Sequence, residues 1–319
     1  MQTKRLQLVV GKGGVGKSTV VAAIALAEAH RGRRVLAVEL GQPGGLARIF
    51  GVRPRAPGEL VEVRTSLAYT FVDGESALAE YLELVVPIRR LLATVFASRI
   101  YRFFVAAAPG LKELMTIGKI WYESQRTDGS GRPLWDTIVV DAGASGHSLQ
   151  YLQMPTTAAQ TFASGLVHRE AKRVEALLKD PALTAVHVVA LPEEMPVTEA
   201  LQIVQRLRGD LSMPLGELLM NRCRSASPAG ASELLERMYA SEPCGDDEVA
   251  GFAAREVWGA IRTAAERALS WEQVQVRSID RLEKQSGQPV HRLPLLFAEE
   301  FGLREVERLA ALLETEAPA

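Results

Sequence analysis

The chain has 319 residues, a formal net charge of −1, and hydrophobic residues at 47% of its positions. It is long and apolar enough to bury a large core, as one α/β domain or as two smaller ones. The balanced charge argues against general nucleic-acid binding, so no nucleic-acid partner is expected. The cysteines, Cys223 and Cys244, are too few and too far apart for a disulfide framework or a zinc site within one chain.

The N-terminus shows no signal-peptide pattern, because it runs directly into an apolar stretch. No uninterrupted apolar run has the length of a membrane span. We therefore expect a soluble, cytoplasmic protein.

An apolar run, a glycine-rich turn and an alanine-rich run open the chain. They predict a strand at Leu6–Val10, a phosphate-binding loop, and a helix from about Ser18 to Ala29. The turn matches the pattern G-x-x-x-x-G-K-[ST], in which glycines let successive N–H groups point at an anion beside a helix N-terminus. Lys17 is expected to bind the β- and γ-phosphates, and Ser18 to bind Mg²⁺. The residues expected around the phosphates are Gly11, Gly13, Gly14, Val15, Gly16, Lys17, Ser18 and Thr19.

A second apolar strand, Val35–Val38, ends at Glu39 and leads into the loop Gly41–Gly45. A β–loop–α–β unit of this length predicts parallel strands joined by a right-handed crossover.

From Glu75 to about Tyr122 the apolar residues recur at helical spacing, interrupted by proline at 87 and 109. We expect a helical insertion subdomain at 75–125 within a single domain that spans 1–319. Two interpretations of its apolar residues remain open. They pack its own core and a dimer partner, or they form a docking surface for a hydrophobic client or a membrane.

The rest of the chain alternates strands with helices. The expected strands are Thr137–Asp141, Val186–Leu191, Leu215–Met220 and Val290–Leu293. The expected helices are Thr198–Arg208, Glu248–Leu269, Trp271–Gln285 and Leu303–Leu313. The alternation predicts an α/β fold with a doubly wound, mainly parallel sheet.

Asp141 ends a buried strand beside the phosphate loop and is expected to hold the Mg²⁺ shell, directly or through water. The alternative is that it caps the next turn. A loop of small residues, 142–147, follows and can change conformation when a γ-phosphate is gained or lost. His147 lies in this loop, and a structural and a functional role are both open for it.

Six segments resemble one protein family in the same order. They are G-K-G-G-V-G-K-S at 11–18, A-P-G-L-K-E at 108–113, D-A-G-A-S-G-H-S-L-Q-Y-L-Q-M-P at 141–155, L-P-E-E-M-P-V-T-E-A-L at 191–201, M-N-R at 220–222 and P-L-L-F-A-E-E-F-G at 294–302. The first is a deviant Walker A motif, with a second lysine, Lys12, after its first glycine. The third is similar to the switch II segment of the arsenite-pump and tail-anchored-protein-targeting ATPases (ArsA/Get3-like). The resemblance covers nearly the whole chain.

The resemblance implies a P-loop ATPase that uses ATP and Mg²⁺ and forms a dimer with ATP at the interface. Lys12 would cross to the opposite subunit's phosphates, as an arginine finger does. The segment from Gly143 to His147 would sense the γ-phosphate. Asn221 would contact adenine, and Pro294 would lie in the last loop of the nucleotide site.

One departure from the family concerns hydrolysis. Alignment on Leu46 and Phe50 places Gly41 where the family has the Asp that orients the attacking water. Such a group contributes about 10²–10⁴-fold to rate. Glu39 either substitutes in part or has a structural role at the loop entry. We expect ATP binding with slow hydrolysis, in a homodimer or in a heterodimer with a paralogous ATPase that supplies the missing group.

The other departure concerns the cysteines. Cys223 and Cys244 cannot form the family's C-x-x-C zinc pair or a metalloid-binding trio, which disfavours arsenite pumping. The expectation is a dimeric switch ATPase, with Lys12, Lys17, Asp141 and Glu39 as its catalytic residues. The alternatives are a targeting factor or chaperone for hydrophobic segments, and a degenerate regulatory subunit of a heterodimer.

Overall fold

The computed structural model describes residues 4–85, 110–143, 145–240 and 248–315. An eight-stranded sheet runs through its centre in the order β3-β4-β2-β5-β1-β6-β7-β8. The strands are β1 (Leu6–Gly11), β2 (Val35–Leu40), β3 (Val61–Arg64), β4 (Leu67–Val72), β5 (Thr137–Asp141), β6 (Thr184–Ala190), β7 (Leu215–Cys223) and β8 (Val290–Pro294). Every neighbouring pair is parallel except β3 and β4. The predicted mainly parallel α/β fold is confirmed.

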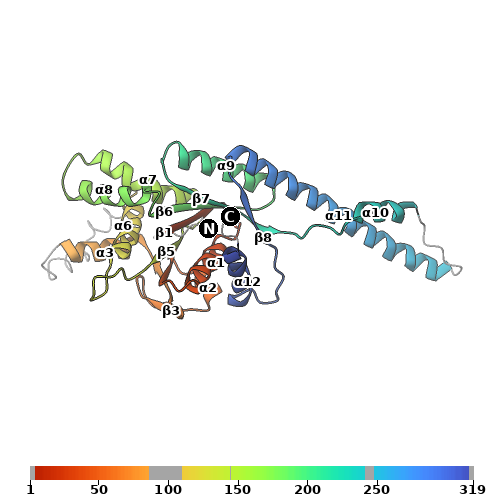
Figure 1. Ribbon diagram of the computed structural model, residues 1–319, viewed down its shortest axis with the longest axis horizontal. Helices are drawn as coiled ribbons and strands as arrows, with labels where there is room; N and C mark the ends of the chain where they lie inside the picture. Colours follow the sequence, from red (N-terminus) through yellow and green to blue (C-terminus); the bar gives the residue numbers. More distant parts are fainter. Residues whose placement is uncertain (1–3, 86–109, 144, 241–247, 316–319) are drawn as a thin grey trace, which may run out of the picture.

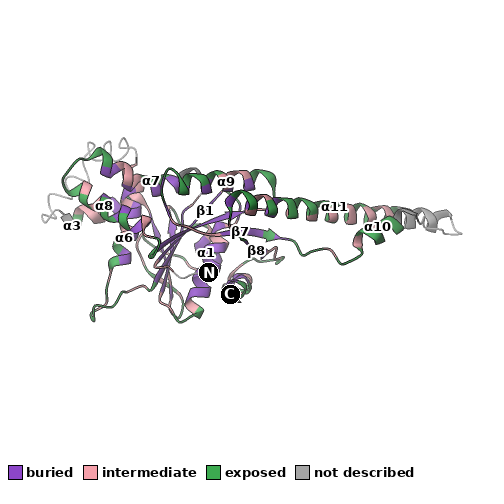
Figure 2. Ribbon diagram, turned by 45° about the horizontal axis from the view of Figure 1, so that its top comes forward, coloured by how far each residue is buried: buried purple, intermediate pink, exposed green. Residues whose placement is uncertain are grey.

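Helices cover both faces of the sheet (Figure 1). They are α1 (Lys17–His30), α2 (Gly45–Phe50), α3 (Gly74–Val85), α6 (Leu111–Gln125), α7 (Ser145–Thr161), α8 (Leu166–Lys179), α9 (Glu194–Arg208), α10 (Ala231–Ala240), α11 (Glu248–Ser286) and α12 (Leu303–Thr315). Alternate residues of β1 serve the two faces, since Leu8 packs in the core under α6, α7 and α9 and Val9 packs in the core under α1 and α12. Burial on both faces explains why the strands read as continuous apolar runs (Figure 2).

The antiparallel edge pair β3–β4 is absent from the sequence-based prediction. Two local signals mark it: the alternation of apolar and charged residues in Val61–Arg64, and the aromatic and β-branched residues in Leu67–Val72. A second difference is that residues 145–147, expected as part of a loop, already belong to α7. That helix also continues past Pro155.

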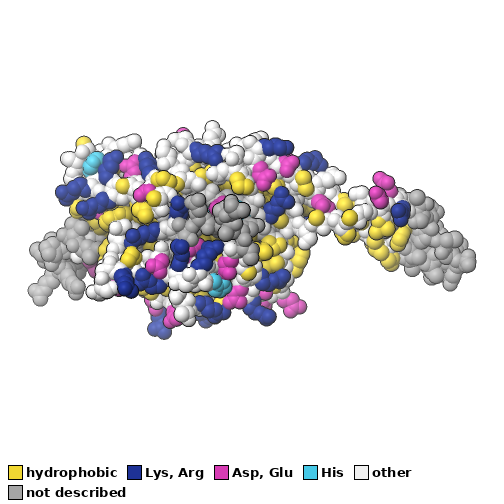
Figure 3. Space-filling model, in the orientation of Figure 1, with side chains coloured by type: hydrophobic (Ala, Val, Ile, Leu, Met, Phe, Trp, Pro, Cys, Tyr) yellow, Lys and Arg dark blue, Asp and Glu magenta, His cyan; other side chains and the backbone are white. Residues whose placement is uncertain are grey.

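The two helices expected between 248 and 285 form one helix of 39 residues, α11. No proline interrupts this stretch, and a helix of that length spans about 58 Å. In its last turns Ile279 and Leu282 are buried in the core, where α11 contacts α9 and β8. The rest projects from the body beside α10 (Figure 1). We call α10 and residues 248–277 of α11 the arm; its exposed apolar side chains include Leu234, Val257 and Ile261 (Figure 3).

The predicted helical insertion is described only at its two ends. Helices α3 and α6 pack against each other, and an ion pair of 2.5 Å joins Glu80 to Lys119. Residues 86–109 lie outside the described part, so the 75–125 subdomain stays a prediction. No helix in the described ranges is long and apolar enough to cross a membrane. The cytoplasmic location also stays a prediction.

Candidate functional site

The loop between β1 and α1 is shaped by its glycines, of which Gly11 and Gly16 are closely packed and Gly13 and Gly14 are not. Gly11, Gly14 and Gly16 have φ of 151°, 84° and 90°. A Cβ atom at Gly11 would lie 2.4 Å from the Val189 carbonyl oxygen, and one at Gly16 would lie 2.3 Å from Asn221 Nδ2. By contrast, a Cβ at Gly13 or Gly14 would meet no atom within 4 Å. The loop is therefore packed on its inner side and open on its outer side, where an anion can approach the backbone N–H groups.

Lys17 is a nearly buried cation at the start of α1. Its side chain is 7% exposed, and its Nζ donates a hydrogen bond of 2.8 Å to the carbonyl oxygen of Lys12. Burial lowers the pKa of Lys17, and the nearby charge of Asp141 opposes that change. The ammonium group would form a stronger hydrogen bond if a phosphate oxygen replaced this neutral carbonyl oxygen, because hydrogen bonds between two charged groups are stronger. Lys17 is thus well suited to bind a phosphate.

Ser18 and Asp141 meet at the tip of β5. The Ser18 hydroxyl donates a 2.5 Å hydrogen bond to Asp141 Oδ2, and the Gly143 N–H donates one of 3.3 Å to Oδ1. Burial raises the pKa of Asp141, against the lowering effect of these hydrogen bonds. Mg²⁺ typically takes one or two protein oxygens and completes its shell with phosphate oxygens and water. This pair of oxygens next to an anion-binding loop fits Mg²⁺ bound to a nucleoside triphosphate.

The carboxylate of Glu39 is buried and hydrogen-bonded within the fold. Its carboxylate accepts hydrogen bonds from three backbone N–H groups and from the hydroxyl of Tyr69; the N–H donors are Gly44 at 3.1 Å, Leu46 at 3.2 Å and Ala47 at 3.2 Å. Burial and the Glu39 charge raise the pKa of Tyr69. This arrangement supports the structural alternative for Glu39, at the entry to the loop before α2. A catalytic role stays a prediction that these contacts make less favourable.

Gly41 stands in the loop after β2, where the resemblance implies an Asp in the family. It has φ of 94°, and a Cβ atom there would meet nothing within 4 Å. Space is available for a side chain, but the backbone has a positive φ, which costs free energy for residues other than glycine. An acidic side chain at this position would therefore fit the space but would strain the backbone. The loop closes against the phosphate loop, since a Cβ at Gly45 would lie 2.7 Å from Ser18 Oγ.

A cavity of about 520 Å³ lies beside the phosphate loop. Its lining residues come from α1, α2, α12, β7, β8 and the loop after β8: Thr19, Arg48, Ile49, Asn221, Arg222, Pro294, Leu295, Leu296, Phe301 and Leu309. The structure thus brings together Asn221 and Pro294, which the sequence placed in the nucleotide site. Asn221 Nδ2 donates to the Val15 carbonyl at 2.9 Å, and its Oδ1 accepts the Arg222 N–H at 2.9 Å. Asn221 therefore supports the phosphate loop, and its contact with adenine stays a prediction.

Two arginines of this cavity, Arg48 and Arg222, were missed by sequence reasoning. Arg222 directly follows Asn221 and has φ of 57°, which turns the chain at the end of β7. Arg48 lies in the last turn of α2, whose C-cap is Gly51. Only the position of Arg222 next to Asn221 offered a signal in the sequence.

Lys12 and the segment from Gly143 to His147 are the remaining parts of the predicted site. Lys12 forms an ion pair of 2.7 Å with Glu199 of α9, and both side chains are about one-third exposed, at 35% and 29%. Gly143 has φ of 70° and contacts Asp141. The side chain of His147 lies outside the described residues, as does Cys244, while Cys223 is buried as a free thiol.

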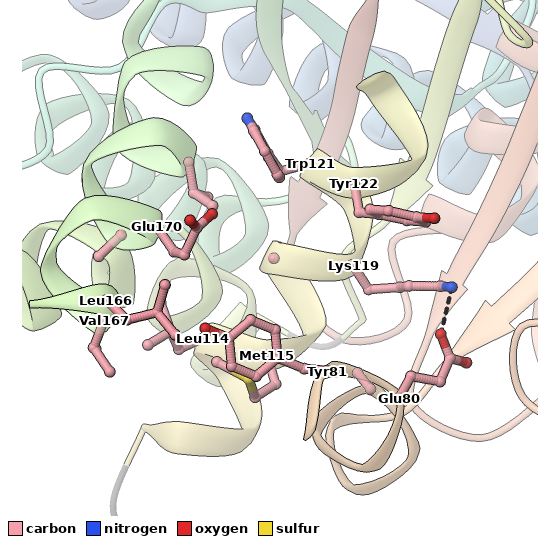
Figure 4. Close-up of a pocket in the computed structure, with 14 residues that line it drawn as sticks. Glu80, Tyr81, Leu114, Met115, Lys119, Trp121, Tyr122, Leu166, Val167 and Glu170 are labelled. Atoms are coloured by element: carbon pink, nitrogen blue, oxygen red, sulfur yellow. Dashed lines mark hydrogen bonds and ion pairs between the residues drawn. The ribbon is translucent and has the colours of Figure 1, made fainter. Parts of the chain in front are cut away.

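A second hollow lies away from the phosphate loop, between α3, α6 and α8 (Figure 4). It encloses about 280 Å³ and has mainly apolar walls, including Tyr81, Leu114, Met115 and Leu166. Lys119 and its partner Glu80 lie at one side of the hollow (Figure 4).

The family model for anion-transporting ATPases matches residues 4–167, just over half of the chain. The chain belongs to this family. The match includes the phosphate loop, Glu39, Asp141 and the described ends of the helical region. It does not include Glu199, Asn221 or Pro294.

Curated relatives agree with membership of the anion-transporting ATPase family. The chain is 35% identical over 230 residues to ATPase BagA of Mycobacterium tuberculosis, a match that covers 68% of this chain and 65% of the relative. It is 24% identical over 268 residues to ATPase ARSA2 of Chlamydomonas reinhardtii, covering 71% and 70%. It is 24% identical over 161 residues to ATPase GET3 of Kluyveromyces lactis, covering 49% and 46%. The chain spans slightly less than two thirds of the length of BagA.

Proposed function

We propose that this member of the anion-transporting ATPase family binds ATP with Mg²⁺ and uses it to switch a dimer between open and closed states. The observation that carries the proposal is the pairing of Ser18 with Asp141 beside the buried ammonium of Lys17, under a loop whose outer side is open. The polar cavity beside Thr19 has the size and position for the nucleoside.

The residues divide the work as follows. Lys17 holds the β- and γ-phosphates, and the loop N–H groups bind their oxygens. Ser18 and Asp141 hold Mg²⁺, which neutralises phosphate charge when bound. Lys12 acts on the partner's phosphates. Hydrolysis is slow on this chain alone, because Gly41 supplies no acid and the carboxylate of Glu39 is occupied by four donors. The partner is a second copy or a paralogous ATPase.

Isothermal titration with ATP and Mg²⁺ tests the proposal. Wild type is expected to bind, and Lys17→Ala to lose at least about tenfold in affinity, as removal of a charge-assisted contact requires. Lys284→Ala is the matched control, since Lys284 is 78% exposed on α11. Equal ATP affinity for wild type and Lys17→Ala would contradict nucleotide binding at this loop.

The hollow between α3, α6 and α8 favours a second candidate function, binding of a hydrophobic client segment. An apolar helix side chain fits such a hollow, and its walls expose Leu166 and Val167 at 37% each. A fluorescent apolar helical peptide is expected to bind wild type and to bind Val167→Asp more weakly, with Val276→Asp on the arm as the control. Unchanged affinity in Val167→Asp would remove this candidate.

A further inference from the structure

Lys12 is held at two points by its own subunit. Its Nζ is 2.7 Å from Glu199 Oε1, and its carbonyl oxygen accepts the hydrogen bond of 2.8 Å from Lys17 Nζ. In the first contact, Glu199 pairs with the Lys12 ammonium group, which the proposed function needs at the partner's phosphates. In the second contact, the Lys12 carbonyl binds the Lys17 ammonium group, which the proposed function needs at the phosphates of this subunit. The two lysines of the loop are therefore engaged internally, and they are engaged through one residue.

Glu199 is mounted on a rigid element. Its neighbours in α9, Val197 and Ala200, are buried at 0% and 1% exposure in the sheet core. Helix α9 cannot follow a moving lysine, because its apolar face is packed against β1, β6 and β7. Movement of Lys12 toward a partner subunit therefore requires the ion pair with Glu199 to break. Because both side chains are partly exposed, water can solvate the two separated charges.

We propose that Glu199 is a positioning residue that retains Lys12 on its own subunit, and that nucleotide bound at Lys17 removes the other of the two contacts that hold Lys12. This inference rests on the proposed function. A phosphate oxygen draws Lys17 Nζ away from the Lys12 carbonyl, because the charged acceptor is stronger. The Lys12 backbone then loses that contact, and the ion pair with Glu199 remains as the restraint on its side chain. Nucleotide in one subunit thus makes Lys12 more available to the other.

The dimer fraction as a function of ATP concentration, measured by sedimentation velocity with Mg²⁺, tests this role. Glu199→Gln keeps the side-chain shape and removes the charge. A partly exposed ion pair corresponds to roughly a 2- to 5-fold change in an equilibrium constant, so this variant is expected to reach half-maximal dimer at about 2- to 5-fold lower ATP. The difference from wild type is expected to shrink at high salt, which screens the pair.

Glu194→Gln is the matched control. Glu194 lies on the same helix and is exposed, without an ion pair in the described part of the chain. It is expected to follow wild type. Glu199→Asp, which keeps the charge, is expected to restore part of the wild-type ATP requirement. Circular dichroism of each variant separates these effects from loss of fold.

A second measurement tests the retention itself without nucleotide or dimer. The rate of acetylation of Lys12 by an amine-reactive reagent, read by peptide mass spectrometry, is expected to rise about 2- to 5-fold in Glu199→Gln. Lys284 in the same sample serves as the internal reference. An unchanged rate at Lys12, or a dimer curve that is unshifted or moved to higher ATP, would overturn the role of Glu199. If those results came with normal ATP binding, the proposed function would stand; absence of ATP binding in wild type would remove both.

Discussion

Ser18 and Asp141 are 123 positions apart in the chain and share a hydrogen bond of 2.5 Å. They meet because β1 and β5 are parallel neighbours, with Val9 in register with Asp141, so that both strands end at one edge of the sheet. The crevice at this edge is where ligands bind in doubly wound α/β proteins.

Asp141→Asn is expected to remove the Mg²⁺ dependence of ATP binding. The amide keeps the size of the side chain but lacks the charge that attracts a hard cation. Titration of ATP with and without Mg²⁺ checks this. Asp136→Asn, at the other end of β5 and bonded to Arg34, is the control for loss of a nearby acid. A variant Asp141→Asn with undiminished response to Mg²⁺ would argue for the turn-capping alternative.

Gly16→Ala is expected to destabilise the protein and to weaken ATP binding. The new Cβ atom would lie 2.3 Å from Asn221 Nδ2, at a residue with φ of 90°. Such backbone strain costs about 1–3 kcal/mol in the free energy of unfolding. Gly13→Ala is the comparison, because a Cβ there meets no atom within 4 Å. Urea denaturation is expected to separate the two variants; equal midpoints would mean that the loop adapts.

Tyr69→Phe is expected to lower stability without changing the rate of ATP turnover. It removes one of the four donors to the Glu39 carboxylate, at a cost of about 1–3 kcal/mol for a buried charged acceptor. Thermal unfolding and a phosphate-release assay measure the two effects. If turnover fell far more than the loss of folded protein explains, Glu39 would have a catalytic role after all.

Acid is expected to destabilise the fold through His187. This side chain is buried between Gln7 and β7: its Nδ1 accepts the Glu217 N–H at 2.9 Å, and its Nε2 donates to Gln7 Oε1 at 3.1 Å. Burial lowers the pKa of His187 from 6.5 to about 4. The unfolded chain therefore binds a proton more readily, so the stability from neutral His187 is complete above about pH 6.5 and is lost as pH falls toward 4.

The pH effect is measured by urea unfolding at intervals between pH 7.5 and 4.5. A single group can contribute a slope of up to about 1.4 kcal/mol per pH unit in this window. The carboxyl of Glu217, whose pKa is lowered by His291, adds a loss at lower pH. His187→Gln is expected to flatten the dependence between pH 6.5 and 4.5, and an unchanged slope in this variant would assign it to other groups.

Much of the sheet could be predicted because parallel strands that are buried on both faces appear in the sequence as continuous apolar runs. The predicted Thr137–Asp141 agrees with β5, and the predicted Leu6–Val10 differs from β1 by one residue. The edge strand β3 was missed because every second residue in it is charged, so it forms no continuous apolar run. Strand β4 was missed although most of its residues are buried and apolar. The long helix α11 was wrongly divided at Ser270, although neither a proline nor a glycine stands at that position.

Local chemistry in the chain was sufficient for the phosphate loop, since glycine conformation, the following helix and the position of Lys17 all depend on a few adjacent residues. The partners of its side chains depend on which strands are neighbours, and no local pattern contains that information. The order of the sheet brings Ser18 to Asp141 and Asn221 to Val15. Packing likewise directs Glu39 toward three backbone donors and Tyr69, and brings Glu199 to Lys12. Residues far apart in sequence acquire these roles because hydrogen bonds and ion pairs act over a few ångströms, a distance that only the folded arrangement of strands provides.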